Sequence, residues 1–82
     1  MTDNEFNILD ELYFVRSFPD LMENIEMSEE EVVETLKSLH SNGWMKVLQS
    51  VDDEVVGLVN WVDHKKLYFL ASKSGLMAHN TL

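Results

Sequence analysis

The sequence contains no cysteine, and that absence excludes disulfides, thiolate metal sites and cysteine nucleophiles. Long apolar runs are also missing, and none approaches the roughly 20 residues that a membrane span requires. The first residues have neither the basic nor the apolar region of a secretory signal peptide. We therefore expect a cytoplasmic protein that has no membrane partner.

Basic residues are scarce. Six lysines and arginines stand against fifteen aspartates and glutamates, which gives a net charge of −9. Eleven of the acidic residues and only two of the basic ones fall within residues 1–41, so this half carries the whole net charge. A field of this sign influences which partners approach the protein, and it opposes binding to nucleic-acid phosphates.

Residue patterns that support catalysis or cofactor binding are absent as well. His40, His64 and His79 have no metal-ligand spacing with one another or with a carboxylate. The acidic stretch 52–54 lacks the alternating ligands and the glycine of a calcium loop, and no glycine-rich phosphate loop occurs. We therefore expect a non-catalytic protein without a metal, cofactor or small-molecule ligand.

The chain does contain enough apolar residues, 45% of its 82 positions, for one globular domain over residues 1–82. The first amphipathic pattern opens with Thr2-x-x-Glu5, a possible capping box, and continues at helical spacing to Arg16. Pro19 then marks the start of a second, two-turn helix that reaches Ile25, because proline is tolerated only in a first helical turn.

The third helix has the clearest signals. Ser28-x-x-Glu31 forms a second capping box, and the three glutamates at 29–31 suit the positive end of the helix dipole. Asn42-Gly43 predicts the helix end, since glycine adopts the left-handed conformation at low cost. The residues expected to form the buried stripe of this helix are Val32, Val33, Leu36 and Leu39.

The second half of the chain favours strands. Residues 44–49 and 67–70 are predicted as strands, with turns at 52–54 and 63–65 and a short C-terminal helix after Ser72-x-x-Gly75. The segment 55–62 (VVGLVNWV) is ambiguous, because Val55, Leu58 and Val62 also match helical spacing. Its valines and its glycine favour a strand.

This order of elements resembles the winged-helix domain of bacterial transcriptional regulators such as the MarR and PadR groups. Residues 18–39 (FPDLMENIEMSEEEVVETLKSL) look like the helix-turn-helix pair. Residues 36–47 (LKSLHSNGWMKV) are similar to the end of a recognition helix that leads into the first wing strand, and 68–75 (YFLASKSG) to the returning strand. The resemblance implies an α+β fold, with a three-helix bundle, a small antiparallel sheet that forms the wing, and a short C-terminal helix.

The resemblance also implies two surfaces for a macromolecule. On the third helix the outward-facing positions would be Glu29, Glu30, Glu34, Lys37, Ser38 and Ser41. On the wing the corresponding residues would be Lys65, Lys66 and Trp61. The glutamates are also explained as helix caps alone, and the lysines as charges that keep strand edges from aggregating.

Three functional hypotheses follow. The acidic helix face or the apolar strand region binds a protein, and self-association through that region or through the first and last helices belongs to this class. Alternatively, the protein binds DNA as a dimer, mainly through the wing, although the charge disfavours this. A third possibility is an acidic protein that occupies the nucleic-acid-binding surface of another protein. Trp44 is expected in the core, and Trp61 as a partner anchor.

Overall fold

Three helices make up the first half of the computed structural model, which describes residues 1–81. They are α1 (Asp3–Asp10), α2 (Phe18–Glu23) and α3 (Glu29–Ser41). Both predicted capping boxes are present, with Thr2 capping α1 and Ser28 capping α3. Gly43 has a φ of +74° directly after α3, which confirms the predicted helix end.

The first helix is shorter than predicted, because the residues that follow it pair with distant parts of the chain. The Leu12 carbonyl accepts a hydrogen bond from the Ala71 N–H at 2.9 Å, and Arg16–Ser17 form strand β1 against a distant strand. The amphipathic spacing up to Arg16 was therefore misleading. The second helix also ends early, at Glu23 rather than Ile25.

Within residues 1–81 the strands form one four-stranded antiparallel sheet, in the order β1-β4-β2-β3. β2 (Met45–Ser50) pairs with β4 (Tyr68–Ala71), and β3 (Asp53–Glu54) pairs with the far end of β2. The α+β class and the antiparallel sheet are thereby confirmed, and the predicted strands 44–49 and 67–70 agree with β2 and β4 to within one or two residues.

The predicted strand over 55–62 is wrong. Strand pairing extends only through Asp53–Glu54 and one further hydrogen bond, from the Val55 N–H to the Val47 carbonyl at 2.8 Å. Residues 55–60 have no regular structure, and Gly57 has a φ of +91°, a conformation that ordinary strands do not contain. The chain then forms a 3-10 helix, η1 (Trp61–Lys66), instead of the predicted turn at 63–65.

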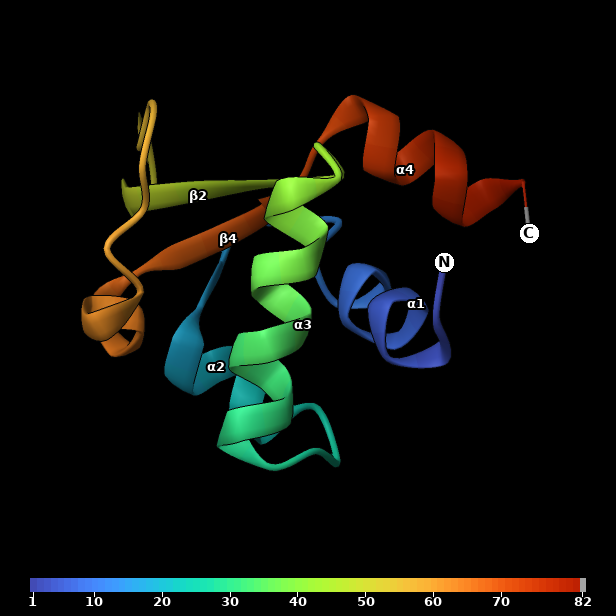
Figure 1. Ribbon diagram of the computed structural model, residues 1–82, viewed down its shortest axis with the longest axis horizontal. Helices are drawn as coiled ribbons and strands as arrows, with labels where there is room; N and C mark the ends of the chain where they lie inside the picture. Colours follow the sequence, from blue (N-terminus) through green and yellow to red (C-terminus); the bar gives the residue numbers. More distant parts are fainter. Residues whose placement is uncertain (82) are drawn as a thin grey trace.

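The last helix, α4 (Lys73–Asn80), begins at the predicted Ser72 cap. It packs against α1, so the start and the end of the chain lie on the same side of the molecule, away from η1 (Figure 1). Gly75 lies within α4 rather than in a turn before it. A Cβ atom at this position would come 1.9 Å from the Trp44 carbonyl oxygen, which shows how closely α4 approaches the start of β2.

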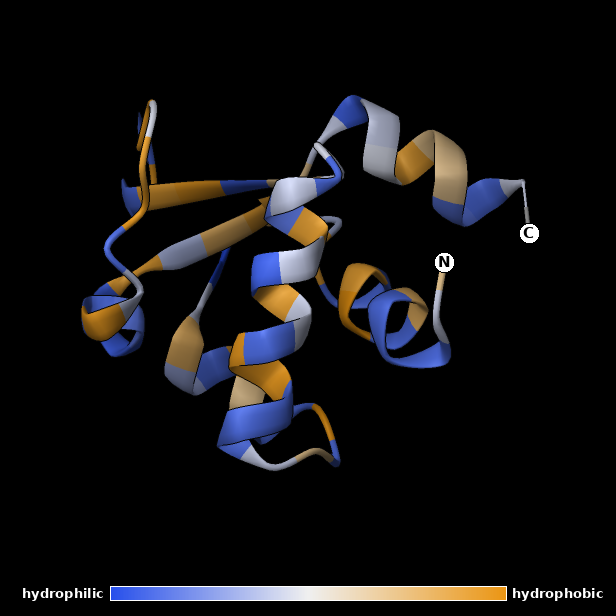
Figure 2. Ribbon diagram, viewed as in Figure 1, coloured by the Kyte–Doolittle hydropathy of each residue, from blue (hydrophilic) through white to orange (hydrophobic). Residues whose placement is uncertain are grey.

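The core lies where α1 packs on α3 and α3 packs on β2, and hydrophobic residues occur along all three elements (Figure 2). Most of the predicted stripe of α3 is confirmed as buried, but Val33 is only half-buried. Trp44 and Trp61 are also half-buried at the edge of the core. The fully buried large side chains are Ile8, Leu9, Leu12, Leu21, Val32, Leu36, Leu39, Val47 and Phe69.

Candidate interaction surfaces

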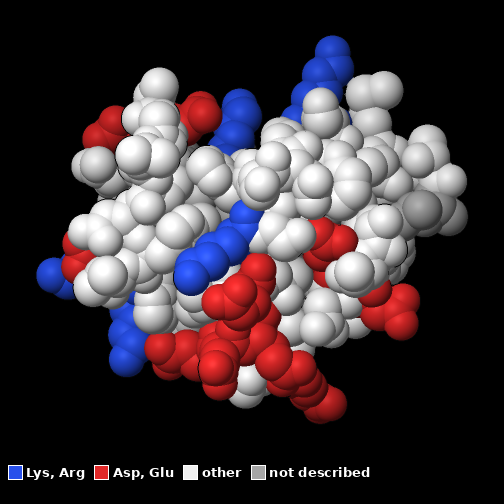
Figure 3. Space-filling model, viewed as in Figure 1, with Lys and Arg blue, Asp and Glu red and all other residues white. Residues whose placement is uncertain are grey.

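The acidic face of α3 is defined by the exposed residues Glu29, Glu30 and Glu34. Acidic side chains gather over the start of α3, where a large part of the visible surface is negative (Figure 3). Glu31 stands apart from them, because its carboxylate accepts hydrogen bonds from the Ser28 N–H at 3.2 Å and the Ser28 hydroxyl at 3.1 Å. Helix capping therefore accounts for Glu31 but not for the outward-facing carboxylates.

The predicted face of α3 is only partly a free surface. Lys37 and Ser41 are exposed as expected, although the Lys37 amine lies 3.5 Å from the Glu34 carboxylate. Ser38 is directed elsewhere, because its hydroxyl donates a hydrogen bond of 2.8 Å to Glu5 of α1. Ser38 is exposed as predicted, but its hydroxyl is occupied by a partner 33 residues away that the helical period does not reveal.

Glu5 is a buried carboxylate, 5% exposed, that joins α1 to α3. Burial by itself raises the pKa of Glu5. Hydrogen bonds from the Thr2 N–H and the Ser38 hydroxyl outweigh that effect, so the pKa of Glu5 lies below its ordinary value. Glu5 thus stays ionised and holds the two helices together, which explains a buried charge that the sequence had indicated only as part of a helix cap.

The residues predicted for the wing lie on η1, not on a two-stranded wing. The Lys65 amine is 3.8 Å from the Glu29 carboxylate, while Lys66 is exposed and belongs to the lining of a surface groove. Trp61 stacks on Phe69 with a ring-centroid distance of 6.4 Å and an interplanar angle of 3°. Much of Trp61 is therefore used to attach η1 to the core.

His64 links η1 to the acidic face of α3. Its Nε2 lies 2.9 Å from a Glu29 carboxylate oxygen, and its Nδ1 lies 2.9 Å from the Trp61 carbonyl oxygen. Both facing atoms are hydrogen-bond acceptors. This contact keeps η1 close to the start of α3.

The segment 51–62 exposes large apolar side chains to an unusual degree. Leu58 is 99% exposed, Val56 89%, Val62 87% and Val51 67%. These four residues are called the apolar tip below. Single exposed apolar side chains are common, but several along one short segment are typical of an interaction site. The predicted strand over 55–62 did not indicate this exposure.

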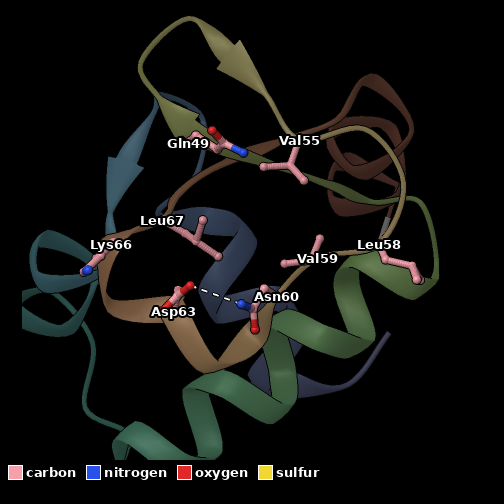
Figure 4. A pocket seen from close by; sticks show the side chains of 8 residues that line it. All are labelled: Gln49, Val55, Leu58, Val59, Asn60, Asp63, Lys66 and Leu67. Atoms are coloured by element: carbon pink, nitrogen blue, oxygen red, sulfur yellow. Dashed lines mark hydrogen bonds between the residues drawn. The ribbon is translucent and has the colours of Figure 1, made fainter.

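A groove of about 280 Å³ lies beside the apolar tip, between the β2–β3 hairpin and η1. In Figure 4 the side chains of Val55 and Val59, from the segment 51–62, and of Leu67, directly after η1, point into it. Polar groups form its rim, where the Asn60 amide donates a hydrogen bond of 3.1 Å to Asp63. The full lining consists of Gln49, Val55, Leu58, Val59, Asn60, Asp63, Lys66 and Leu67.

Two further polar regions lie elsewhere on the molecule. A hollow of about 410 Å³ between α1 and residues 24–27 is lined mainly by amides and carboxylates. At the junction of α1 and α4, the buried His79 stacks on Phe6 at 4.1 Å and its Nδ1 lies 2.8 Å from the Tyr13 hydroxyl. No group of three or more histidine, cysteine, aspartate or glutamate side chains in residues 1–81 could hold a metal ion.

Comparison with known proteins adds no assignment. No protein-family model, no curated protein and no solved structure matches the chain. Among residues 1–81 no helix is both long and apolar enough to cross a membrane. Any function must therefore be argued from the α3 face, the apolar tip and the groove.

Proposed function

We propose that the protein is a non-catalytic winged-helix module that binds another protein through its apolar tip. The winged-helix part of this proposal is supported by the strand order. β1 lies between the first two helices and pairs with β4, which in turn pairs with β2. Under this proposal α2 and α3 correspond to the helix-turn-helix pair, and residues 51–67, between β2 and β4, correspond to the wing.

The charges of α3 support a protein partner over DNA. In a DNA-binding domain of this kind, the start of the recognition helix faces the duplex and basic side chains neutralise phosphates. Here that position holds Glu29 and Glu30, both exposed. Lys65, one of the two basic residues of η1, lies within ion-pair distance of Glu29, so part of its charge is already compensated.

The observation that carries the proposal is the exposure of the apolar tip. Removing an apolar side chain from water contributes roughly 25 cal/mol per Å² buried, and Leu58 leaves nearly all of its surface in water. Three of the four tip residues are more than 85% exposed on one short segment, next to a groove with an apolar floor. A partner surface that covers this segment would remove these apolar side chains from water, which folding of the chain alone does not do.

The first arm of the test measures DNA binding. A labelled random-sequence duplex is titrated with the protein at low salt, where phosphate attraction is strongest, and its fluorescence anisotropy is recorded. We expect no rise up to about 100 µM protein, the weak end of non-specific DNA binding. A rise that fades steeply with added salt would overturn the proposal in favour of a DNA-binding regulator that uses the wing.

The second arm compares affinity capture by three forms of the protein. The test variant is Leu58→Asn/Val62→Asn, and the control is Met77→Asn, which replaces another exposed apolar residue on α4. We expect the same proteins on the wild type and on the control, and their loss from the test variant. Identical capture by all three forms would exclude the apolar tip as the binding surface.

A further inference from the structure

The charge around the apolar tip indicates what kind of protein segment covers it. Between Val51 and Lys66 the chain carries four carboxylates, at Asp52, Asp53, Glu54 and Asp63, against two lysines. Lys65 lies 3.8 Å from the Glu29 carboxylate, and Lys66 belongs to the lining of the groove. The three carboxylates at 52–54 are all exposed, and Asp63 lies on the rim of the groove. Carboxylates thus outnumber lysines around the apolar tip, and Lys65 is already paired with Glu29.

We propose that the groove and the apolar tip bind a protein segment that has an apolar side chain flanked by lysine or arginine. This inference rests on the protein-binding function proposed above and specifies its partner. The apolar side chain enters the groove, where it contacts Val55, Val59 and Leu67. The flanking cations face the carboxylates at 52–54 and at Asp63.

The size and the form of the groove fit this occupant. At about 280 Å³ it lies just below the range of pockets that enclose drug-sized ligands, which begin at roughly 300 Å³. It is therefore suited to an anchoring side chain and not to a cofactor. The Asn60–Asp63 hydrogen bond fixes part of the rim and leaves carboxylate lone pairs available to a cation.

Charge also disfavours the other occupants. A second copy of the chain would bring two net charges of −9 together, with acidic residues bordering the contact on each side. A nucleic acid or an anionic membrane would meet the same carboxylates with like charge. A partner with basic flanks experiences attraction both from the tip region and from the net charge of the whole molecule.

The test is a selection of phage-displayed random dodecapeptides on the immobilised wild-type protein. We expect enrichment of peptides in which a leucine, phenylalanine or similar residue is flanked by lysine or arginine. A selected peptide is then synthesised, and its affinity is measured by anisotropy for four forms of the protein. Leu58→Asn/Val62→Asn tests the apolar contact, Asp53→Asn/Glu54→Gln tests the charge, and Met77→Asn is the control.

Each outcome has a defined meaning. A loss of about tenfold or more in the apolar variant, together with a weaker salt dependence in the charge variant, supports the proposal. Enriched peptides that are acidic, or affinity that neither variant changes, would overturn it while leaving a protein-binding function elsewhere on the chain. If no peptide is enriched, the inference fails. If capture by the wild type and the apolar variant is also identical, the proposed function fails as well.

Discussion

Replacing Gly75 by alanine is a sharp test of how α4 is attached to the sheet, because two physical effects predict opposite signs. Gly75 lies inside a helix, and alanine stabilises a helix interior by up to about 1 kcal/mol relative to glycine. The added Cβ, however, would lie 1.9 Å from the Trp44 carbonyl oxygen, whereas ordinary contacts begin at 3.4 Å. The backbone must therefore move by about 1.5 Å, the difference between these two distances.

The magnitude follows from what that movement disrupts. The same Trp44 carbonyl accepts the Ser72 N–H at 2.9 Å, the hydrogen bond that fixes the start of α4. Overpacking costs typically 1–3 kcal/mol, and losing one hydrogen bond costs about 1 kcal/mol. Set against the propensity gain of about 1 kcal/mol, the net destabilisation of Gly75→Ala is about 1–3 kcal/mol. For a domain of this size it corresponds to a fall in Tm on the order of 5–20 °C.

Urea unfolding followed by far-UV circular dichroism measures this difference. The matched control is Ser74→Ala, because Ser74 is the preceding residue of α4 and is exposed. The control should be as stable as the wild type or slightly more stable. If Gly75→Ala were also as stable as the wild type or more so, the close approach of α4 to Trp44 would be refuted and helix propensity would dominate.

Three further predictions concern other parts of the fold. Glu5→Gln should lose stability relative to the wild type at neutral pH. Because the pKa of Glu5 is lower in the folded protein, its contribution to stability is present above the ordinary carboxyl value of 4.5 and is lost as the pH falls through the folded pKa. The urea midpoints of the wild type and Glu5→Gln should therefore converge at low pH. A constant difference between them at all pH values would contradict this. Ser28→Ala removes the cap of α3 and should cost about 1 kcal/mol in the same assay, while no change would mean that Glu31 and solvent replace the cap. Trp61→Ala should cost about 1.5–3 kcal/mol, less than a fully buried tryptophan, because only part of its ring packs on Phe69. Limited proteolysis of that variant should cleave within 51–66 faster than in the wild type, and equal rates would show that Trp61 does not hold η1.

Features with local causes were predictable from the sequence. The caps at Thr2 and Ser28 and the helix end at Gly43 depend on residues within three or four positions of one another, and all are present. The ends of α1 and α2 were not predictable in this way. At Arg16 helical spacing competes with pairing to Phe69, a residue more than fifty positions away, and the pairing prevails.

The same distinction applies to the candidate site. The exposed glutamates of α3 follow from the helical period, so Glu29, Glu30 and Glu34 were placed on the surface correctly. Ser38 is exposed as well, but its hydroxyl bonds to Glu5, a long-range partner that the helical period does not reveal. Likewise, Lys65 and Lys66 were recognised as exposed cations, but their 3-10 helix depends on Trp61 stacking on the core.

The segment that sequence analysis placed wrongly is also the segment that supports the proposed function. Residues 55–62 have the composition of a buried strand, yet one sheet of this size has no second layer to cover them. Contacts made by Trp61 and His64 hold the segment against the rest of the domain, while Leu58 and Val62 remain exposed to water. Local preference and tertiary structure usually agree where only stability is at stake, and they tend to disagree at functional sites. Selection for the folded chain alone gives no reason for an apolar residue at Leu58, whereas a partner that buries it does.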